Sequence, residues 1–361
     1  MPTTHKKQIK TFILALIILF GSALGIWANF LYSSLISDDQ GYKYTVKPGT
    51  AIHTVIDDLT HADIIKHPLF FKYLVYLKGN SHELKSGEYL FPKGTNSLQL
   101  LKQITTGSGV IYHTFTIIPG WNFKQVRAAI LQNPDLDHSS RNLTDDAIMA
   151  QLGEPNTNPE GEFYPDTYYF IEGSSDITLL KRAHHSMQEK LKNTWNHRDP
   201  NLPYQTPYEA LIVASLIEKE AQQNMERPII AGVIVNRLNK GMLLQIDPTV
   251  IYGMGTRYNG VIHKTDLIEN TPYNTYVHKG LTPTPIAMPG EDSIQAAMHP
   301  KKHDFYYFVV RGTGESTHQF TSTLEDHYKA VSESKKFRPD FFNNDLIRYY
   351  LSKIVLPMQL T

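Results

Sequence analysis

Cysteine is absent from all 361 residues of this chain. Its absence excludes disulfide bonds, zinc sites built from thiolates and a cysteine nucleophile. Net charge is absent as well, because 35 basic residues balance 35 acidic ones. Without a basic excess or a basic run there is no electrostatic field to gather nucleic acid, so we expect no nucleic-acid partner.

The sequence also lacks the short motifs that mark several common enzyme classes. It contains no glycine-rich phosphate loop and no Gly-x-Ser-x-Gly elbow of a serine hydrolase. Its 16 histidines include no His-Glu-x-x-His pattern, and the adjacent His184 and His185 would point to different sides of a helix. The sequence therefore predicts neither a metal site nor a cofactor.

A long uncharged segment lies close to the N-terminus. Residues 12–31 are almost wholly apolar and follow a short stretch with three lysines. About 20 apolar residues suffice to cross a bilayer, and lysines favour its cytoplasmic side. We therefore expect a cytoplasmic N-terminus at 1–10, a transmembrane anchor at 11–33, and the rest of the chain outside the cytoplasm. A cleaved signal peptide is the alternative, but the run is long and lacks a small-x-small cleavage site.

Residues 43–107 predict a small module. Its expected elements are strands at 44–46 and 87–91 and helices at 52–59, 68–77 and, after a cap at Asn96 or Ser97, up to 106. This order, with its opening Tyr-x-Val-x-x-Gly, resembles a LysM-type βααβ module. Such modules often bind N-acetyl sugars, and a spacer without a ligand is equally compatible with the pattern.

Residues 110–335 predict a larger domain of mixed composition, followed by a C-terminal tail at 336–361. Its expected elements are strands at 110–118 and 306–311 and helices at 123–131, 143–152, 179–193 and from 206 onwards. Helices and strands are mixed rather than regularly alternating, so the expected fold class is α+β.

The helix after residue 206 carries the first candidate for chemistry. Thr206 and Glu209 form a capping-box pattern around Pro207, and residues 210–217 are apolar nearly all round. Glu218 follows directly. Apolar surroundings disfavour the charged form of a carboxyl group, which suits a general acid. A structural role, with the carboxylates at this helix end paired to Lys219 or Arg227, is equally compatible with the sequence.

Several blocks together resemble one known family. They are ASLIEKE at 214–220, VNRL at 235–238, LQIDPTVIYG at 244–253, EGEFYPDTY at 160–168, YNTY at 273–276, Gly280-Leu281 and HQF at 318–320. These blocks resemble the MltG (YceG-like) family of endolytic murein transglycosylases, and the resemblance covers about residues 10–333.

The resemblance implies a lyase that cleaves peptidoglycan with one carboxylate. Glu218 would protonate the glycosidic oxygen between N-acetylmuramic acid and N-acetylglucosamine, and then accept the proton of the muramyl C6 hydroxyl as its oxygen attacks C1. The products carry 1,6-anhydromuramyl ends. The family also implies a single-pass protein of the bacterial inner membrane, with its catalytic domain in the periplasm, that works with peptidoglycan synthases to trim or terminate nascent glycan strands.

The remaining polar residues of the same blocks are candidates for substrate binding. They are Asn236, Gln245, Asp247, Tyr252, Asn274, Tyr276, Glu162 and Asp166. For Asp247, which precedes a proline, a role as helix cap is equally compatible. Glu162 and Asp166 are also compatible with structural turns, and Asn236 with packing.

Two other functions remain open from the sequence. One is a hydrolase, or muramidase, which would need a second carboxylate from among Glu220, Glu162 and Asp247. The other is a peptidoglycan-binding scaffold without activity, which the LysM-like module would suit.

Overall fold

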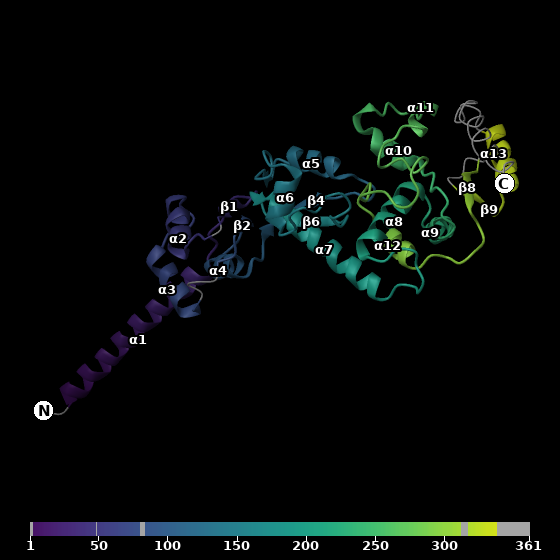
Figure 1. Cartoon of the computed structure of the whole chain (residues 1–361). Helices are drawn as coiled ribbons and strands as arrows, with labels where there is room; N and C mark the ends of the chain where they lie inside the picture. Colours follow the sequence, from purple (N-terminus) through teal and green to yellow (C-terminus); the bar gives the residue numbers. More distant parts are fainter. Residues whose placement is uncertain (1–2, 48, 80–83, 312–316, 338–361) are drawn as a thin grey trace. The chain divides into compact units, whose positions relative to one another are not determined.

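The structure is a computed structural model that describes residues 3–47, 49–79, 84–311 and 317–337. Contacts divide the chain into two compact units. Unit 1 consists of Met1–Thr114 and Tyr169–Ser174, and unit 2 of Phe115–Tyr168 and Ser175–Thr361. Both contain helices and antiparallel strands, so the predicted α+β class is confirmed (Figure 1). The predicted C-terminal tail lies almost wholly outside the described residues.

Unit 1 begins with a long apolar helix, α1 (Thr3–Tyr32). Its segment Lys7–Tyr32 is long and apolar enough to cross a membrane. The end of α1 packs on the rest of unit 1, since Phe30 is 5% exposed and its carbonyl accepts a hydrogen bond of 2.8 Å from the Ser97 hydroxyl. A membrane span and a signal sequence both fit these dimensions.

The remainder of unit 1 is a small sheet with three helices. Its elements are β1 (Tyr42–Val46), α2 (Ile52–His61), α3 (Pro68–Lys78), β2 (Gly87–Phe91), α4 (Ser97–Thr106) and β3 (Val110–Ile111). The strands form an antiparallel sheet in the order β1-β2-β3, with Tyr44 opposite Tyr89. Asn96 caps α4 through a capping box with Gln99. The predicted elements are confirmed here, whereas the relation to LysM modules stays a prediction.

Unit 2 is larger and mostly helical. The elements that follow β3 are β4 (His113–Thr116), α5 (Phe123–Gln132), β5 (Leu136–Asp137), α6 (Asp145–Leu152), β6 (Thr167–Phe170), β7 (Ser174–Ser175), α7 (Asp176–Asn196), α8 (Pro207–Glu220), η1 (Asn224–Glu226), α9 (Arg227–Asn239), α10 (Asp247–Met254), η2 (Gly255–Arg257), α11 (Lys264–Leu267), α12 (Glu291–Met298), β8 (Tyr307–Val310), β9 (His318–Thr321) and α13 (Leu324–Phe337). The strand predicted at 110–118 is divided into β3 and β4. β8 pairs with β9 and is half-buried rather than buried.

Helix α8 forms the centre of unit 2. Thr206 and Glu209 make the predicted capping box, and Pro207 occupies the first turn. All residues from 210 to 217 are buried, and α8 contacts α7, α9, α10 and α12 (Figure 1). A helix that is apolar on every side is stable only when neighbours surround it. Its last turn therefore presents Glu218 and Glu220 among other elements rather than to open solvent.

Replacing a buried α8 side chain should destabilise the protein. Leu216 is fully buried, so Leu216→Ala should lower the free energy of unfolding by about 2–5 kcal/mol. Ile268→Ala removes a side chain that is 53% exposed and serves as the control. Thermal unfolding of the two variants measures the difference, and equal melting temperatures would contradict the central position of α8.

Candidate active site

The carboxylate of Glu218 is held by four donors. Arg227, the first residue of α9, contacts both oxygens, with Nη1 at 3.0 Å from Oε2 and Nη2 at 3.3 Å from Oε1. The backbone N–H of Gly290 and the hydroxyl of Ser293 donate to Oε2 at 2.9 and 2.7 Å. Both partners of the ion pair are mostly buried, with 7% of the Glu218 side chain and 12% of that of Arg227 exposed.

These contacts give the Glu218 carboxylate a structural role, while its predicted catalytic role stays a prediction. Hydrogen bonds in which the donor is a guanidinium are among the stronger ones, and two such bonds fix the plane of the carboxyl group. Gly290 is the N-cap of α12, so the positive end of the α12 dipole also faces the Glu218 carboxylate. Glu218 thus ties α8, α9 and α12 together, which agrees with the pairing to Arg227 that the sequence left open.

A second buried pair fastens the neighbouring segment. Glu226 accepts hydrogen bonds from the backbone N–H of His318 and contacts its Nδ1, each at 2.7 Å. Both side chains are less than a tenth exposed. Because Glu226 directly precedes Arg227, this contact connects β9 to the start of α9 and fixes the position from which Arg227 reaches Glu218.

Glu220 has the opposite environment to Glu218. No hydrogen bond or ion pair within the described residues reaches its carboxyl group. Burial raises the pKa of Glu220 to about 8, repulsion from Asp247 acts in the same direction, and Arg237 acts against both. Glu220 is also the last residue of α8, where the negative end of the helix dipole disfavours a negatively charged carboxyl group. A carboxyl group in these surroundings holds its proton at neutral pH.

Asp247 faces Glu220 from the start of α10. The crowding of its carboxyl group by protein atoms raises the pKa of Asp247, while a hydrogen bond from the Tyr276 hydroxyl lowers it. The residue nevertheless keeps exposed surface. The helix-cap role is contradicted, because the N-cap of α10 is Ile246 and no side chain caps this helix. The Asp247 side chain bonds to Tyr276 instead.

The segments that carry Gln245, Asp247 and Tyr276 are tied together by Thr275. The Thr275 carbonyl accepts from the Gln245 N–H at 3.1 Å, and the Thr275 hydroxyl accepts from the Ile246 N–H at 2.9 Å. The same hydroxyl bonds to that of Thr249, also at 2.9 Å. The YNTY and LQIDPTVIYG blocks are therefore one structural unit, in which Tyr276 sets the orientation of Asp247.

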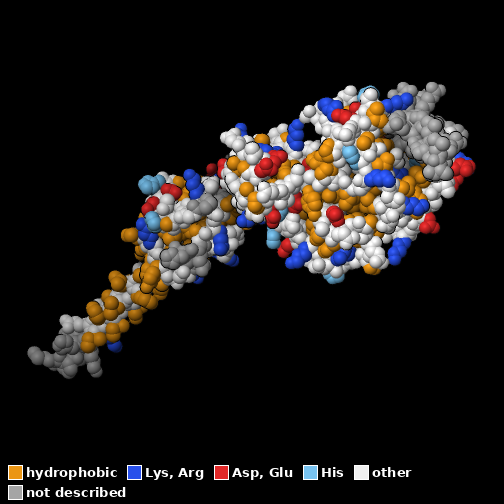
Figure 2. All heavy atoms as spheres, in the orientation of Figure 1, with side chains coloured by type: hydrophobic (Ala, Val, Ile, Leu, Met, Phe, Trp, Pro, Cys, Tyr) orange, Lys and Arg blue, Asp and Glu red, His pale blue; other side chains and the backbone are white. Residues whose placement is uncertain are grey.

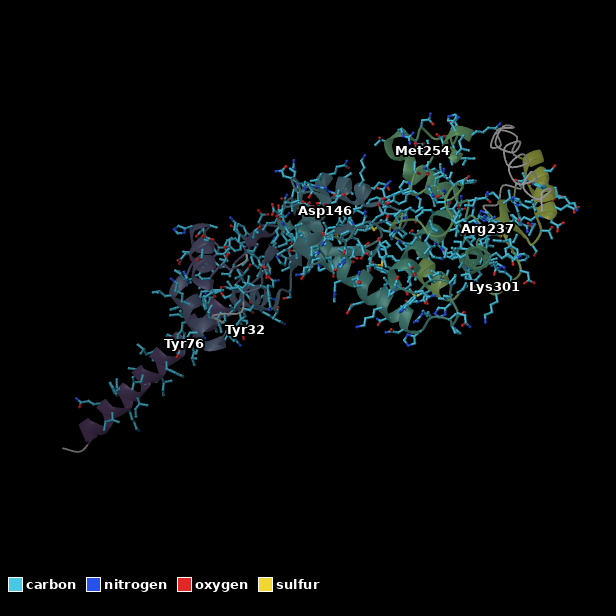
Figure 3. The ribbon with its side chains drawn as sticks, in the orientation of Figure 1. Tyr32, Tyr76, Asp146, Arg237, Met254 and Lys301 are labelled. Atoms are coloured by element: carbon cyan, nitrogen blue, oxygen red, sulfur yellow. The ribbon has the colours of Figure 1, made fainter. Side chains whose placement is uncertain are left out.

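Gln245 and Arg237 complete this group, which we name the Glu220–Asp247 cluster (Glu220, Arg237, Gln245, Asp247 and Tyr276). Gln245 has a φ of 52°, in the left-handed region that side chains other than glycine rarely adopt. Arg237, labelled in Figure 3, is 8% exposed and donates to the carbonyls of Leu244 and Tyr306 at 2.7 and 2.6 Å. Backbone strain of this kind gathers at functional sites.

Two predicted binding residues have structural roles in the folded chain. Asn274 is 1% exposed, donates to three carbonyls of residues 266–269 and accepts from the N–H of Tyr276. Asn236 donates to the carbonyls of His303 and Phe305 at 2.8 and 3.0 Å. Because Asn274 is buried and its amide is bonded through both the nitrogen and the oxygen, it organises the YNTY turn. Asn236 fastens the segment before β8.

Tyr252 belongs to a separate cluster. Its hydroxyl donates to Glu160 at 3.0 Å, and its ring lies 4.7 Å from that of Tyr273, measured between centroids. Glu160 is 4% exposed and also accepts from the N–H of Phe123 at the start of α5. Burial raises the pKa of Glu160 to about 7, although both hydrogen bonds lower it. No pattern in the sequence predicted a role for the Glu160 carboxyl group.

Glu162 and Asp166 have neighbours other than Glu218 and Glu220. Glu162 is 2% exposed and accepts from the amide of Gln188 at 2.7 Å, so it is a buried structural carboxylate. Asp166 is exposed and helps to line a surface pocket of about 480 Å³ between α7 and α12. In the described part of the chain, no three histidine, aspartate or glutamate side chains gather as metal ligands would.

Glu220 and Arg227 were only alternatives in the sequence analysis, and Ser293 had no predicted role. Glu220 stands two residues after Glu218, about 200° further round the helix, and therefore meets different neighbours. Which side receives α10 and which receives α12 depends on packing between segments far apart in the sequence. The only local signal was the presence of two carboxylates in the ASLIEKE block.

The model of the YceG-like family matches residues 44–333, which include every block described above. The chain belongs to the YceG-like family. The predicted resemblance is therefore confirmed.

Two relatives with the same functional name and one solved structure are similar to this chain. An endolytic murein transglycosylase of Bacillus subtilis (strain 168) is 32% identical over 327 residues, which cover 84% of this chain and 89% of the relative. An endolytic murein transglycosylase of Streptococcus pneumoniae (strain D39) is 27% identical over 90% of this chain and 65% of its own length. A YceG-like protein of Listeria monocytogenes, known from a crystal structure, is 28% identical, with a TM-score of 0.53 over 81% of this chain and 99% of its own.

Removing only Arg227 from the Glu218–Arg227 ion pair should destabilise this YceG-like chain more than replacing both partners. Arg227→Met leaves the Glu218 charge buried without its guanidinium, so we expect a loss of about 3–5 kcal/mol in the free energy of unfolding. The double variant Glu218→Gln with Arg227→Met should recover part of that loss. A double-mutant cycle on thermal unfolding measures the coupling, and strictly additive losses would contradict a structural pair.

The raised pKa of Glu220 predicts a pH-dependent stability. The folded pKa of about 8 exceeds the unfolded value, so the folded chain loses stability as the pH rises between about 4.5 and 8. Glu220→Gln removes this loss, and its melting temperature should exceed that of the parent at pH 9 but match it near pH 4.5. Glu209→Gln, at the other end of α8, is the control. If Glu220→Gln is no more stable than the parent at pH 9, the raised pKa of Glu220 is contradicted.

Proposed function

We propose that this chain is an endolytic lytic transglycosylase that cleaves peptidoglycan between N-acetylmuramic acid and N-acetylglucosamine. Family membership and relatives named endolytic murein transglycosylases support this function. The structural observation that carries it is the half-buried carboxyl group of Glu220 at the end of α8, close to Asp247, where burial raises the pKa of Glu220 to about 8. Protonation of a glycosidic oxygen needs such an acid.

We assign the acid to Glu220 rather than to Glu218. The family resemblance implies one acid/base in the ASLIEKE block, and both glutamates belong to it. The Glu218 carboxylate accepts from Arg227, Gly290 and Ser293, whereas the pKa of Glu220 is raised by burial and by Asp247. Glu218 then acts as a positioning residue that locks α8 against α9 and α12.

The reaction follows from one carboxyl group used twice. Glu220 gives its proton to the oxygen that joins C1 of N-acetylmuramic acid to N-acetylglucosamine, and the C1–O bond breaks. The resulting carboxylate takes the proton of the muramyl C6 hydroxyl while that oxygen bonds to C1. Attack from within the same sugar has the advantage of proximity, worth on the order of 7–11 kcal/mol in well-oriented systems. The product ends in 1,6-anhydromuramic acid.

Asp247 supports a second candidate, a muramidase that uses water. Glycosidases that use water need two carboxylates, and Asp247 lies near enough to Glu220 to raise its pKa. As a carboxylate, Asp247 would activate the water, whereas in a transglycosylase it would stabilise positive charge at C1. Gln245 and Tyr276 belong to the same cluster in both mechanisms.

Membrane attachment and substrate binding by unit 1 are further parts of the proposal. α1 would act as an uncleaved single-pass anchor in the bacterial inner membrane, with its N-terminus in the cytoplasm and the rest of the chain outside it. The length and apolar character of α1 support the span. The lysines that precede the apolar run support the orientation. The small module of unit 1 would bind glycan. Partnership with peptidoglycan synthases stays a prediction from the family resemblance.

The test is mass spectrometry of purified glycan strands after incubation with the full-length protein. Products that end in 1,6-anhydromuramic acid are expected, and ends heavier by one water would identify the muramidase. Strands left uncut by a folded protein would contradict both.

Variants of the two glutamates test which residue is the acid. Glu220→Gln should keep its fold and lose activity by at least about 10²-fold, since it cannot donate a proton. Glu218→Gln should lower the melting temperature and retain measurable cleavage below it. The assignment is wrong if Glu218→Gln keeps its melting temperature but loses all cleavage while Glu220→Gln remains active.

A further inference from the structure

Helix α3 of unit 1 exposes a stripe of large apolar side chains. The exposed fractions are 78% for Leu69, 38% for Phe70, 53% for Tyr73, 78% for Tyr76 and 54% for Leu77. These five residues, the α3 stripe, recur every three to four positions and therefore lie on one side of the helix. The opposite side is buried in the core of unit 1 through Phe71, Leu74 and Val75. Exposed apolar groups in such a continuous row indicate an interaction surface.

The α3 stripe continues onto the end of α1. The Trp27 ring lies 5.8 Å from that of Phe70 and 5.6 Å from that of Tyr73, measured between centroids. Phe30 lies 5.6 Å from Phe70. Figure 3 labels Tyr32 of α1 and Tyr76 of α3, both on the side of unit 1 where α1 arrives, and Figure 2 shows hydrophobic side chains gathered along α1 and beside this junction.

The length of α1 determines where this junction must lie if α1 spans a membrane. Side chains from Thr11 to Ile26 are exposed, and from Trp27 onward α1 packs on unit 1. The uncharged free part, which follows Lys10, rises only about 24 Å, at about 1.5 Å per residue. The hydrocarbon core of a bilayer is about 30 Å thick. α1 can therefore cross it only if the part of unit 1 around Trp27 reaches the membrane surface.

We infer that the α3 stripe is a membrane-docking surface that lies in the interface of the bilayer, with its aromatic rings among the headgroups. This inference rests on the anchor role of α1 in the proposed function. Tyrosine and tryptophan favour the interface because one end of each ring is apolar and the other polar. The exposed Lys66 and Lys78 flank the stripe and suit lipid phosphates, while Lys72 pairs with Asp57 at 3.4 Å.

Docking through two elements has a mechanical consequence. A single helix would let unit 1 tilt and rotate about its attachment, whereas α1 and α3 together hold unit 1 in one orientation. The height of unit 1 above the bilayer is then fixed by α1 and α3 rather than by a linker. An amphipathic helix that lies in the interface plane binds by its apolar face and depends on lipid contact along its length.

Site-directed fluorescence in nanodiscs that hold one full-length chain tests the inference. The chain has no cysteine, so Leu69→Cys or Tyr76→Cys accepts one environment-sensitive label without competing sites. We expect lipid-borne nitroxide to quench both labels several-fold more than a label at Ser108→Cys. Ser108 is exposed and follows the C-terminal end of α4, the end away from the Ser97 contact with α1. Iodide in the water should quench them in the reverse order.

A label at Leu19→Cys, in the middle of α1, separates the outcomes. If lipid quenches the Leu19 label but iodide quenches Leu69 and Tyr76 as strongly as Ser108, the anchor holds and docking by α3 is refuted. If neither quencher reaches Leu69 and Tyr76, protein covers the stripe, and lipid docking is also refuted. If lipid fails to quench the Leu19 label, the proposed anchor fails and the docking inference fails with it. Cleavage of glycan strands by each labelled chain confirms that it is folded.

Discussion

The unfavourable burial of one negative charge is the constraint on which the rest of the site depends. Glu220 ends a fully packed helix, next to a second carboxylate and without a hydrogen bond from the described residues. Each of these features favours the neutral acid, and only Arg237 opposes them. Such a site costs stability when the carboxyl is ionised, and proteins accept that cost mainly where a proton must be held and released.

Helix α8 holds both carboxylates but uses them differently. Glu218 meets a guanidinium, an N–H and a hydroxyl, and its charge becomes a connection between α8, α9 and α12. Glu220 meets Asp247, which Tyr276 orients and Thr275 connects to the YNTY turn. The ionic contacts of Glu218 therefore fix the helix end that presents Glu220. Because both residues lie on one helix, the ASLIEKE block supplies both the ion pair that positions α8 and the proposed proton donor.

Local signals in the sequence predicted the elements well, because caps, turns and apolar periodicity act over a few residues. Thr206 caps α8 and Asn96 caps α4 as expected. The family was also predictable, since its blocks are long and specific. The roles of individual polar residues were not. Asn274 is buried and bonded within its own turn, and Asp247 bonds to Tyr276 rather than to a helix N-terminus. The role of Asp247 depends on a contact between segments 29 residues apart, and that of Asn274 on the path of an irregular loop, neither of which spacing encodes.

The protonation of Glu220 at neutral pH is the central claim, and infrared difference spectroscopy measures it most directly. Spectra of the parent minus those of Glu220→Gln, recorded across pH 5 to 10, isolate the C=O band of this carboxylic acid. The account predicts a protonated carboxyl at pH 7 that ionises near pH 8. A difference spectrum that shows only carboxylate at pH 7, with ionisation complete near pH 5, would contradict it and return the acid role to another residue.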